Sequence, residues 1–245
     1  MKFNEPAYRW RGGGFAPVAL PADISSMSLL GLDEQIEILN KNLDRFIAGK
    51  AALNVLLWGE KGAGKSTIVR LWTRDYAPKG LRIIEFCDDD YYSIYALYGM
   101  FRENKDLRFV LYFDDVSFDN NDERYRDFKS IVEGGLETKP ANSIFVATSN
   151  RKHLVTERAS DTADLYNRDE QNETTSLFAR FGLPVGFYPT NKELYLEIVK
   201  YYLGTENIAA FDGWETAAEN FAIDHGGRSG RTAQQFVIYH QIQGK

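Results

Sequence analysis

The sequence predicts an α/β fold, in which a five-stranded parallel sheet is flanked by helices and followed by a small all-helical lid. Short apolar runs, typical of strands buried on both faces, alternate with amphipathic stretches of helical period. A glycine-rich turn joins one such run, residues 53–58, to a helix. Only helical patterns follow residue 189. We therefore divide the chain into a leader (1–26), an α/β core (27–188) and a helical lid (189–245).

The composition is that of a packed globular protein with no strong field for nucleic acid or membranes. The 245 residues are 44% hydrophobic, and 29 basic against 35 acidic side chains give a net charge of −6. No apolar run reaches the length of a membrane span, and the N-terminus has no signal-peptide core, so we expect a cytoplasmic protein. One cysteine, Cys87, and three scattered histidines argue against structural zinc and thiol chemistry.

The first 50 residues are expected to form a leader and one helix. Glycines and prolines predict that the leader is irregular, with Tyr8, Trp10 and Phe15 anchoring it to the core. A turn at Gly31 then precedes an amphipathic helix that ends at Gly49. The apolar residues before this helix either flank an adenine ring or belong only to the core, and the sequence leaves both interpretations open.

The glycine-rich turn matches a phosphate-binding loop at every fixed position. It consists of Gly59, Glu60, Lys61, Gly62, Ala63, Gly64, Lys65 and Ser66, and Thr67 follows it. Its glycines allow the backbone N–H groups to converge on a β-phosphate at the start of the helix. Lys65 supplies a charge for the β- and γ-phosphates, and the Ser66 hydroxyl coordinates Mg²⁺. The turn therefore predicts a site for a magnesium-bound nucleotide.

A second buried strand carries two carboxylates at its C-terminal end. Residues 109–115 read FVLYFDD, and ligand sites in parallel sheets lie at the carboxyl ends of the strands. We expect Asp114 to hold the water shell of Mg²⁺ and Asp115 to orient or deprotonate the attacking water.

Further polar residues follow other predicted strands. Asn150, at the tip of the strand 142–148, either senses the γ-phosphate or the water or only forms a turn. The acidic run 88–90 is expected to cap the next helix rather than bind a metal. The tyrosine-rich stretch 91–101 has the spacing of a core helix, although its rings also suit base stacking. Residues 151–175 have no clear periodicity and predict a long loop.

Taken in order, these motifs resemble those of AAA+ ATPases over nearly the whole chain. More narrowly, AYRWRGGGFAPV, NVLLWGEKGAGKST, FVLYFDDVSFD, FVATSNRKHL and SLFARFGL look like segments of a bacterial family of ATP-binding proteins catalogued as domain of unknown function 815. The resemblance implies the AAA+ type of P-loop NTPase fold and binding of ATP with Mg²⁺. It also implies a homo-oligomer.

By motif position, the resemblance assigns further roles. Asn150 corresponds to sensor 1, Arg180 to the arginine finger and Arg231 to sensor 2, with Arg228 as the alternative for the last role. A surface ion pair with Glu170 or Glu173 is the other interpretation of Arg180, and Arg158 and Arg168 are the alternative fingers. Many vigorous hydrolases of the superfamily have glutamate where this chain has Asp115, which is one methylene shorter, so slow turnover stays open as an alternative.

The expected function is an Mg²⁺-dependent ATPase that couples ATP binding and hydrolysis to a conformational change acting on an unidentified macromolecular partner. Two alternatives stay open. One is a nucleotide-gated switch with little turnover. The other is a nucleic-acid loader or remodeller related to replication initiators, against which the acidic charge balance argues.

Overall fold

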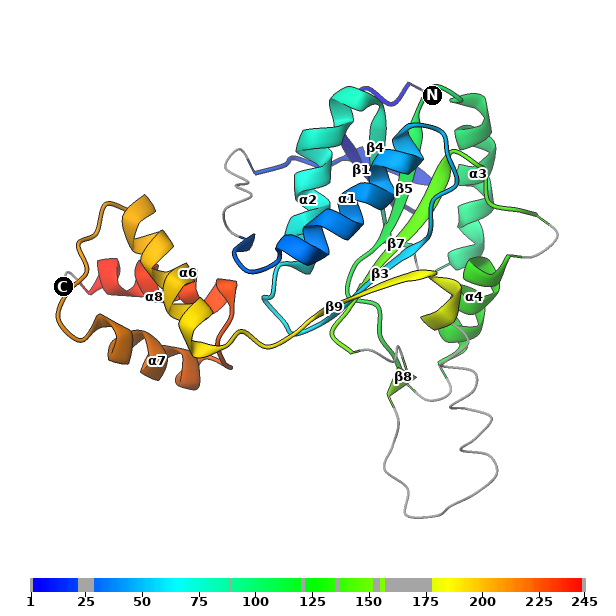
Figure 1. Cartoon of the computed structure of the whole chain (residues 1–245). Helices are drawn as coiled ribbons and strands as arrows, with labels where there is room; N and C mark the ends of the chain where they lie inside the picture. Colours follow the sequence, from blue (N-terminus) through cyan, green and yellow to red (C-terminus); the bar gives the residue numbers. More distant parts are fainter. Residues whose placement is uncertain are drawn as a thin grey trace, which may run out of the picture.

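The computed structural model describes residues 2–21, 29–88, 90–119, 122–134, 137–151, 155–156 and 178–243, and has the α/β architecture that the sequence predicts (Figure 1). Its main sheet has the order β2-β1-β4-β5-β7-β3-β9 and is parallel except between β1 and β2. The strands are β1 (Ala7–Arg11), β2 (Gly14–Pro17), β3 (Val55–Gly59), β4 (Leu81–Phe86), β5 (Arg108–Phe113), β7 (Ser143–Ser149) and β9 (Leu183–Phe187). Two short strands, β6 (Phe118–Asp119) and β8 (Val155–Thr156), pair separately.

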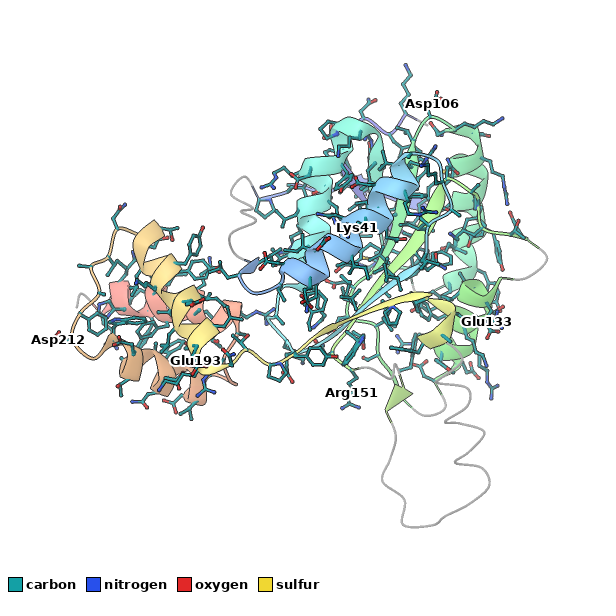
Figure 2. The ribbon with its side chains drawn as sticks, in the orientation of Figure 1. Lys41, Asp106, Glu133, Arg151, Glu193 and Asp212 are labelled. Atoms are coloured by element: carbon teal, nitrogen blue, oxygen red, sulfur yellow. The ribbon has the colours of Figure 1, made fainter. Side chains whose placement is uncertain are left out.

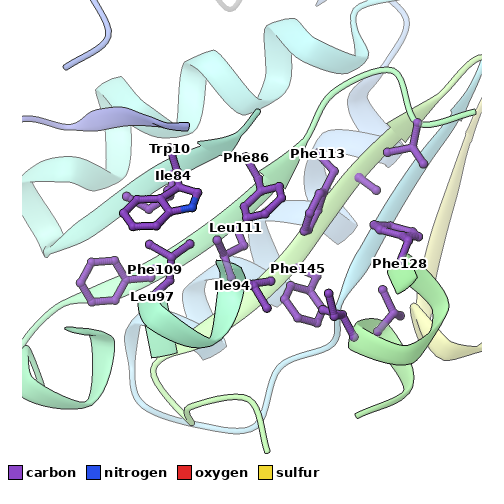
Figure 3. Close-up of a cluster of buried hydrophobic side chains, with 14 of the residues drawn as sticks. Trp10, Ile84, Phe86, Ile94, Leu97, Phe109, Leu111, Phe113, Phe128 and Phe145 are labelled. Atoms are coloured by element: carbon purple, nitrogen blue, oxygen red, sulfur yellow. The ribbon is translucent and has the colours of Figure 1, made fainter. Parts of the chain in front are cut away.

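Helices cover both faces of this sheet. One face packs against α1 (Asp33–Ile47) and α2 (Lys65–Tyr76), and the other against α3 (Ile94–Glu103) and α4 (Glu123–Glu133) (Figure 1). The second face is unusually aromatic: Figure 3 shows Trp10, Phe86, Phe109, Phe113 and Phe145 in one buried cluster. Side chains of successive strand residues alternate between the two clusters, as period-2 geometry requires.

The N-terminal leader contains a β-hairpin, so the prediction of an irregular segment is wrong for residues 7–17. Gly12 and Gly13, with φ of 57° and 74°, form the two-residue turn between Arg11 and Gly14. Strand β1 then pairs with β4, and the buried Trp10 donates a hydrogen bond to Ser93 Oγ over 3.0 Å. The hairpin adds two strands to the five that were predicted, which gives seven in the main sheet.

The C-terminal helices form a separate layer beside the core (Figure 1). These helices, α6 (Lys192–Thr205), α7 (Trp214–Asp224) and α8 (Gly230–Ile242), share their own hydrophobic cluster. Among the partly buried residues packed against it is Leu30, which precedes α1. The helices occupy the range predicted for the lid, and the division of the chain at residue 189 stays a prediction.

The acidic run 88–90 serves local structure where it is described. The Asp90 carboxylate accepts a hydrogen bond from the Tyr92 backbone at the start of a 3₁₀ helix, Tyr91–Ser93. Asp88 accepts from Ser93 Oγ and from the backbone of Gly12 in the hairpin turn. No group of three or more acidic, histidine or cysteine side chains suited to a metal occurs among the described residues. Asp89 and most of the predicted loop 151–175 lie outside these residues.

Among the residues that the structure describes, no helix has the length and apolar character needed to cross a bilayer.

Candidate functional site

The glycine-rich turn lies between the end of β3 and the start of α2. Gly59 has a φ of 128°, and a Cβ built there would lie 1.9 Å from the carbonyl oxygen of Phe187 on β9. A Cβ on Gly62 would lie 2.9 Å from Ser229 Oγ and 3.0 Å from the Cβ of Arg231 in the lid. The turn is therefore closed in from two sides, and only glycine fits at these two positions without displacing a neighbour.

Lys65 is the buried cation of the turn. Its ammonium donates hydrogen bonds to the carbonyl oxygens of Gly59 and Glu60, over 2.7 and 2.8 Å, and to Asn150 Oδ1 over 3.3 Å. Burial lowers the pKa of Lys65, and the nearby carboxylates of Asp115, Glu60 and Asp114 oppose that shift. Lys65 is thus a partly desolvated positive charge beside the two strand-borne aspartates.

Asp114 follows β5, and its carboxylate is bound to the first turn of α2. Ser66 Oγ donates to Asp114 Oδ1 over 3.1 Å, while the Tyr112 and Thr148 hydroxyls donate to the same oxygen over 2.5 and 2.7 Å. Burial alone raises the pKa of Asp114, but these three hydrogen bonds and the charge of Arg70 outweigh it and hold the pKa below its usual value. The carboxylate is therefore ionised and fixed in orientation near neutral pH.

Asp115 has a left-handed backbone with a φ of 52°. Its backbone N–H donates to Thr148 Oγ1 over 2.8 Å, and its carboxylate accepts a hydrogen bond from the Asn150 side-chain amide. Since the same amide group accepts from Lys65, Asn150 bridges the ammonium and the second carboxylate. The structure thus brings Lys65, Asp115 and Asn150 together; their individual roles stay predictions.

A cavity of about 990 Å³ separates these groups from the lid. From the core it is lined by Lys61, Gly62, Ala63, Gly64, Lys65, Ser66, Thr67, Arg70, Asp114, Asp115, Thr148 and Asn150. Leu30 and Leu32, which precede α1, also line it and are the apolar residues considered for adenine. From the lid come Leu194 and Ile198 of α6 and Arg231 of α8. The volume is ample for a nucleotide between the two layers.

The two arginines at the start of α8 lie in different surroundings. Arg231 lines the cavity, and its Cβ lies beside Gly62 of the glycine-rich turn. Arg228 instead donates two hydrogen bonds to the Glu219 carboxylate of α7, over 2.8 and 2.6 Å. Arg231 is therefore the better placed of the two to contact a ligand in the cavity.

Arg180 lies elsewhere, just before the edge strand β9. Its side chain is 54% exposed, and its Nε lies 4.0 Å from Glu133 Oε1 at the end of α4. Figure 2 labels Glu133 on the side of the core away from the lid. The sequence-based partners Glu170 and Glu173 and the alternative fingers Arg158 and Arg168 lie outside the described residues. Arg180 does not line the cavity of its own chain.

Among the residues that sequence reasoning missed, Arg70, Tyr112 and Thr148 act directly on Asp114. Arg70 is four residues after Ser66, so it follows one turn later on the same face of α2 and lines the cavity. Tyr112 and Thr148 each precede a predicted site residue, Asp114 and Asn150, by two positions. Period-2 alternation along β5 and β7 was the signal that would have identified them.

The donors present fit a nucleotide with Mg²⁺. A glycine turn that admits no Cβ at Gly59 or Gly62 leads into the N-terminus of α2, where backbone N–H groups favour phosphate. Oxygen ligands suit Mg²⁺, and Ser66 and Asp114 supply them 3.1 Å apart. Lys65 and Arg231 supply positive charge on the facing walls.

Comparison with solved structures shows an α/β fold of the AAA+ P-loop NTPase type. RuvB of Thermotoga maritima, described as a Holliday junction branch migration motor, superposes with a TM-score of 0.54 at 16% identity, covering 83% of this chain and 59% of RuvB. An arginine-to-alanine variant of the same protein gives a TM-score of 0.55 at 15% identity, covering 86% of this chain and 62% of that one. The chain therefore spans about three fifths of the length of these neighbours. No curated protein matches it. A family model described as "Protein of unknown function (DUF815)" matches residues 4–244, so the chain belongs to the DUF815 family.

Proposed function

We propose that the chain is an Mg²⁺-dependent ATPase in which ATP binding and hydrolysis move the helical lid, and in which a neighbouring copy completes the active site. The observation that carries the proposal is the meeting, around one cavity, of Lys65, Ser66, Asp114 and Asp115 from the core and Arg231 from the lid. A ligand that contacts both layers changes the energy of their relative arrangement. Phosphate chemistry in this cavity is therefore coupled to the lid.

Each group has a chemical task in this mechanism. Lys65 exchanges its carbonyl partners for the β- and γ-phosphates, and the N–H groups of the turn bind the same phosphates. Ser66 and Asp114 would hold Mg²⁺, which when bound neutralises phosphate charge. Asp115 orients the attacking water and accepts its proton, while Asn150 holds the Asp115 carboxylate in position.

The test is Asp115→Asn, which separates nucleotide binding from chemistry. Since Asp114 keeps its three hydrogen bonds and still serves the metal, we expect ATP affinity close to that of the wild type. Hydrolysis should fall by about 10²-fold or more, because an amide does not accept the proton of the attacking water. Nucleotide affinity by fluorescence and phosphate release should be measured on the same preparation. An equal loss of both would assign Asp115 to the metal instead.

The lid arginines give a second, internally controlled comparison. Arg231→Ala should weaken nucleotide binding or slow turnover, since the side chain lines the cavity. Arg228→Ala removes the same charge from the same turn but breaks only the pair with Glu219 within the lid, and should leave both quantities near wild type. Isothermal titration with ATP and steady-state turnover measure the difference. If the two variants behave alike, the lid has no nucleotide sensor at Arg231.

A slow nucleotide-gated switch is the second candidate, favoured by the state of Asp115. An aspartate is one methylene shorter than a glutamate would be at this position. In addition, the Asp115 carboxylate already accepts a hydrogen bond from Asn150. Both features keep the carboxylate back from a water molecule in the cavity. Single-turnover measurements would favour the switch over the rapid ATPase if bound ATP is hydrolysed much more slowly than it binds. The lid should then stay protected from proteolysis for as long as ATP remains bound.

A further inference from the structure

Tyr112 and Thr148 lie on the metal-binding face of the sheet because of strand alternation. In β5, Val110 and Tyr112 belong to the cluster under α1 and α2, whereas Leu111 and Phe113 belong to the opposite cluster. Asp114, two residues after Tyr112, therefore continues on the α2 side, where it meets Ser66. In β7 the same alternation brings Thr148 to this face, after Ile144 and Val146.

Three hydroxyl groups converge on one oxygen of Asp114. Tyr112, Thr148 and Ser66 all donate to Oδ1, over 2.5, 2.7 and 3.1 Å. A carboxylate oxygen offers about two lone pairs in its plane, so three donors saturate it. Tyr112 is 7% exposed and Thr148 2%, so water does not readily replace their hydroxyls. Oδ1 is occupied, and Oδ2 is the oxygen that Asp114 can offer to a cation in the cavity.

The number of free oxygens bears on the choice of cation. Mg²⁺ keeps a small octahedral shell with several waters and uses carboxylates through one oxygen, whereas Ca²⁺ takes six to eight ligands and often binds a carboxylate through both oxygens. From this we propose, on the basis of the ATPase function above, that Tyr112 and Thr148 restrict Asp114 to one free oxygen and thereby make the site select Mg²⁺ over Ca²⁺. Tyr112 and Thr148 are positioning residues, because they act through Asp114.

Thr148 is hydrogen-bonded to both aspartates, Asp114 and Asp115. Its Oγ1 accepts the Asp115 backbone N–H over 2.8 Å while it donates to Asp114. The left-handed backbone of Asp115 is unfavourable for a residue with a Cβ, and this hydrogen bond helps to hold it. Thr148 thus contacts both aspartates, whereas the Tyr112 hydroxyl donates to Asp114.

The experiment measures cation preference without turnover. Binding of a fluorescent, non-hydrolysable ATP analogue is followed while MgCl₂ or CaCl₂ is added, and the half-saturating concentrations give a Ca²⁺/Mg²⁺ ratio. For Tyr112→Phe we expect the half-saturating Mg²⁺ to rise by about 10-fold, the usual scale for losing a hydrogen bond to a metal ligand, with a much smaller change for Ca²⁺. Thr148→Val should change the ratio in the same direction, and Thr148→Ser, which keeps the hydroxyl, should restore it.

A matched control is Tyr195→Phe, because Tyr195 is also buried but donates its hydroxyl to the Ala218 carbonyl within the lid over 3.1 Å. This variant should keep the wild-type ratio. An unchanged ratio in both Tyr112→Phe and Thr148→Val, or equal factors for both cations, would overturn the inference and leave the ATPase proposal standing. A wild-type protein that binds the analogue with neither cation would overturn the proposed function, and this inference with it.

Discussion

Lys65→Ala is expected to abolish ATP binding. The substitution removes the ammonium that bonds to Gly59, Glu60 and Asn150, and with it the buried positive charge that faces the β- and γ-phosphates. Arg231 comes from the other wall of the cavity and does not share that geometry. Equilibrium titration with a fluorescent ATP analogue should show no saturable binding at concentrations that fill the wild-type site.

The control for this variant is Lys41→Ala. Lys41 is an exposed lysine of α1 that pairs with Glu37 (Figure 2), so its removal changes the net charge equally without touching the cavity. Circular dichroism should confirm that Lys65→Ala is folded, since the buried ammonium also makes three hydrogen bonds to the protein. Unchanged ATP affinity in a folded Lys65→Ala protein would refute the assignment of the phosphate site.

Arg180→Ala is expected to lower ATP hydrolysis by about 10³-fold or more, the usual scale for an arginine finger, while leaving ATP affinity largely unchanged. The side chain is exposed beside the edge strand β9, and it does not line the cavity of its own chain. A planar guanidinium in that position can serve the γ-phosphate of a neighbouring copy, where it stabilises charge that develops in the transition state.

Mixing two inactive variants tests whether Arg180 acts on a neighbour. Arg180→Ala protein keeps an intact phosphate site, and Lys65→Ala protein keeps an intact arginine. Mixed assemblies should therefore recover ATPase activity at the interfaces that combine the two. No recovery, in mixtures that sizing shows to co-assemble, would mean that Arg180 works within its own chain or is structural.

Glu133→Gln distinguishes the finger from a simple ion pair. The 4.0 Å approach of Arg180 to Glu133 is a surface contact, and such pairs contribute at most about 1 kcal/mol to stability. If Arg180 mattered only through this pair, Glu133→Gln would reproduce the loss seen in Arg180→Ala. We expect the glutamine variant to keep wild-type turnover.

Local patterns predicted most of the core because each element is specified by its own residues. The strand before Gly59, the strand before Asp114 and the three lid helices all appear where hydrophobic periodicity indicated them. The hairpin at 7–17 is not predicted because glycines and prolines at this density also indicate irregular structure. A glycine pair between alternating aromatic residues is also the signal of a two-residue turn, and only pairing with β4, some 70 residues later, turns that signal into a strand.

Residues of the candidate site could be predicted where they belong to a sequence motif. Those that only the packing of the fold brings to the site could not. Lys65, Ser66 and Asp114 belong to motifs, and in the structure they line the same cavity. Tyr112 lies in an apolar run, where its aromatic ring fits the pattern of a buried strand. Nothing in that pattern points to a role for its hydroxyl. For Arg180 the sequence offers Glu170 and Glu173 as partners, and both lie outside the described residues. The structure adds Glu133, which is distant in sequence and lies 4.0 Å away. Similarly, the sequence does not separate Arg228 from Arg231, whereas in the structure Arg228 pairs with Glu219 and Arg231 lines the cavity.

The close approach of Gly59 to Phe187 gives the phosphate loop a direct mechanical link to the lid. Phe187 ends β9, its carbonyl accepts the Glu60 N–H over 3.0 Å, and only four residues, 188–191, separate it from the first turn of α6. The end of β9 is therefore held to the loop by main-chain atoms, and the ring of Trp58, next to Gly59, packs edge-on against Tyr188. Because only residues 188–191 lie between this contact and α6, we expect a displacement of the loop to move the near end of α6 as well.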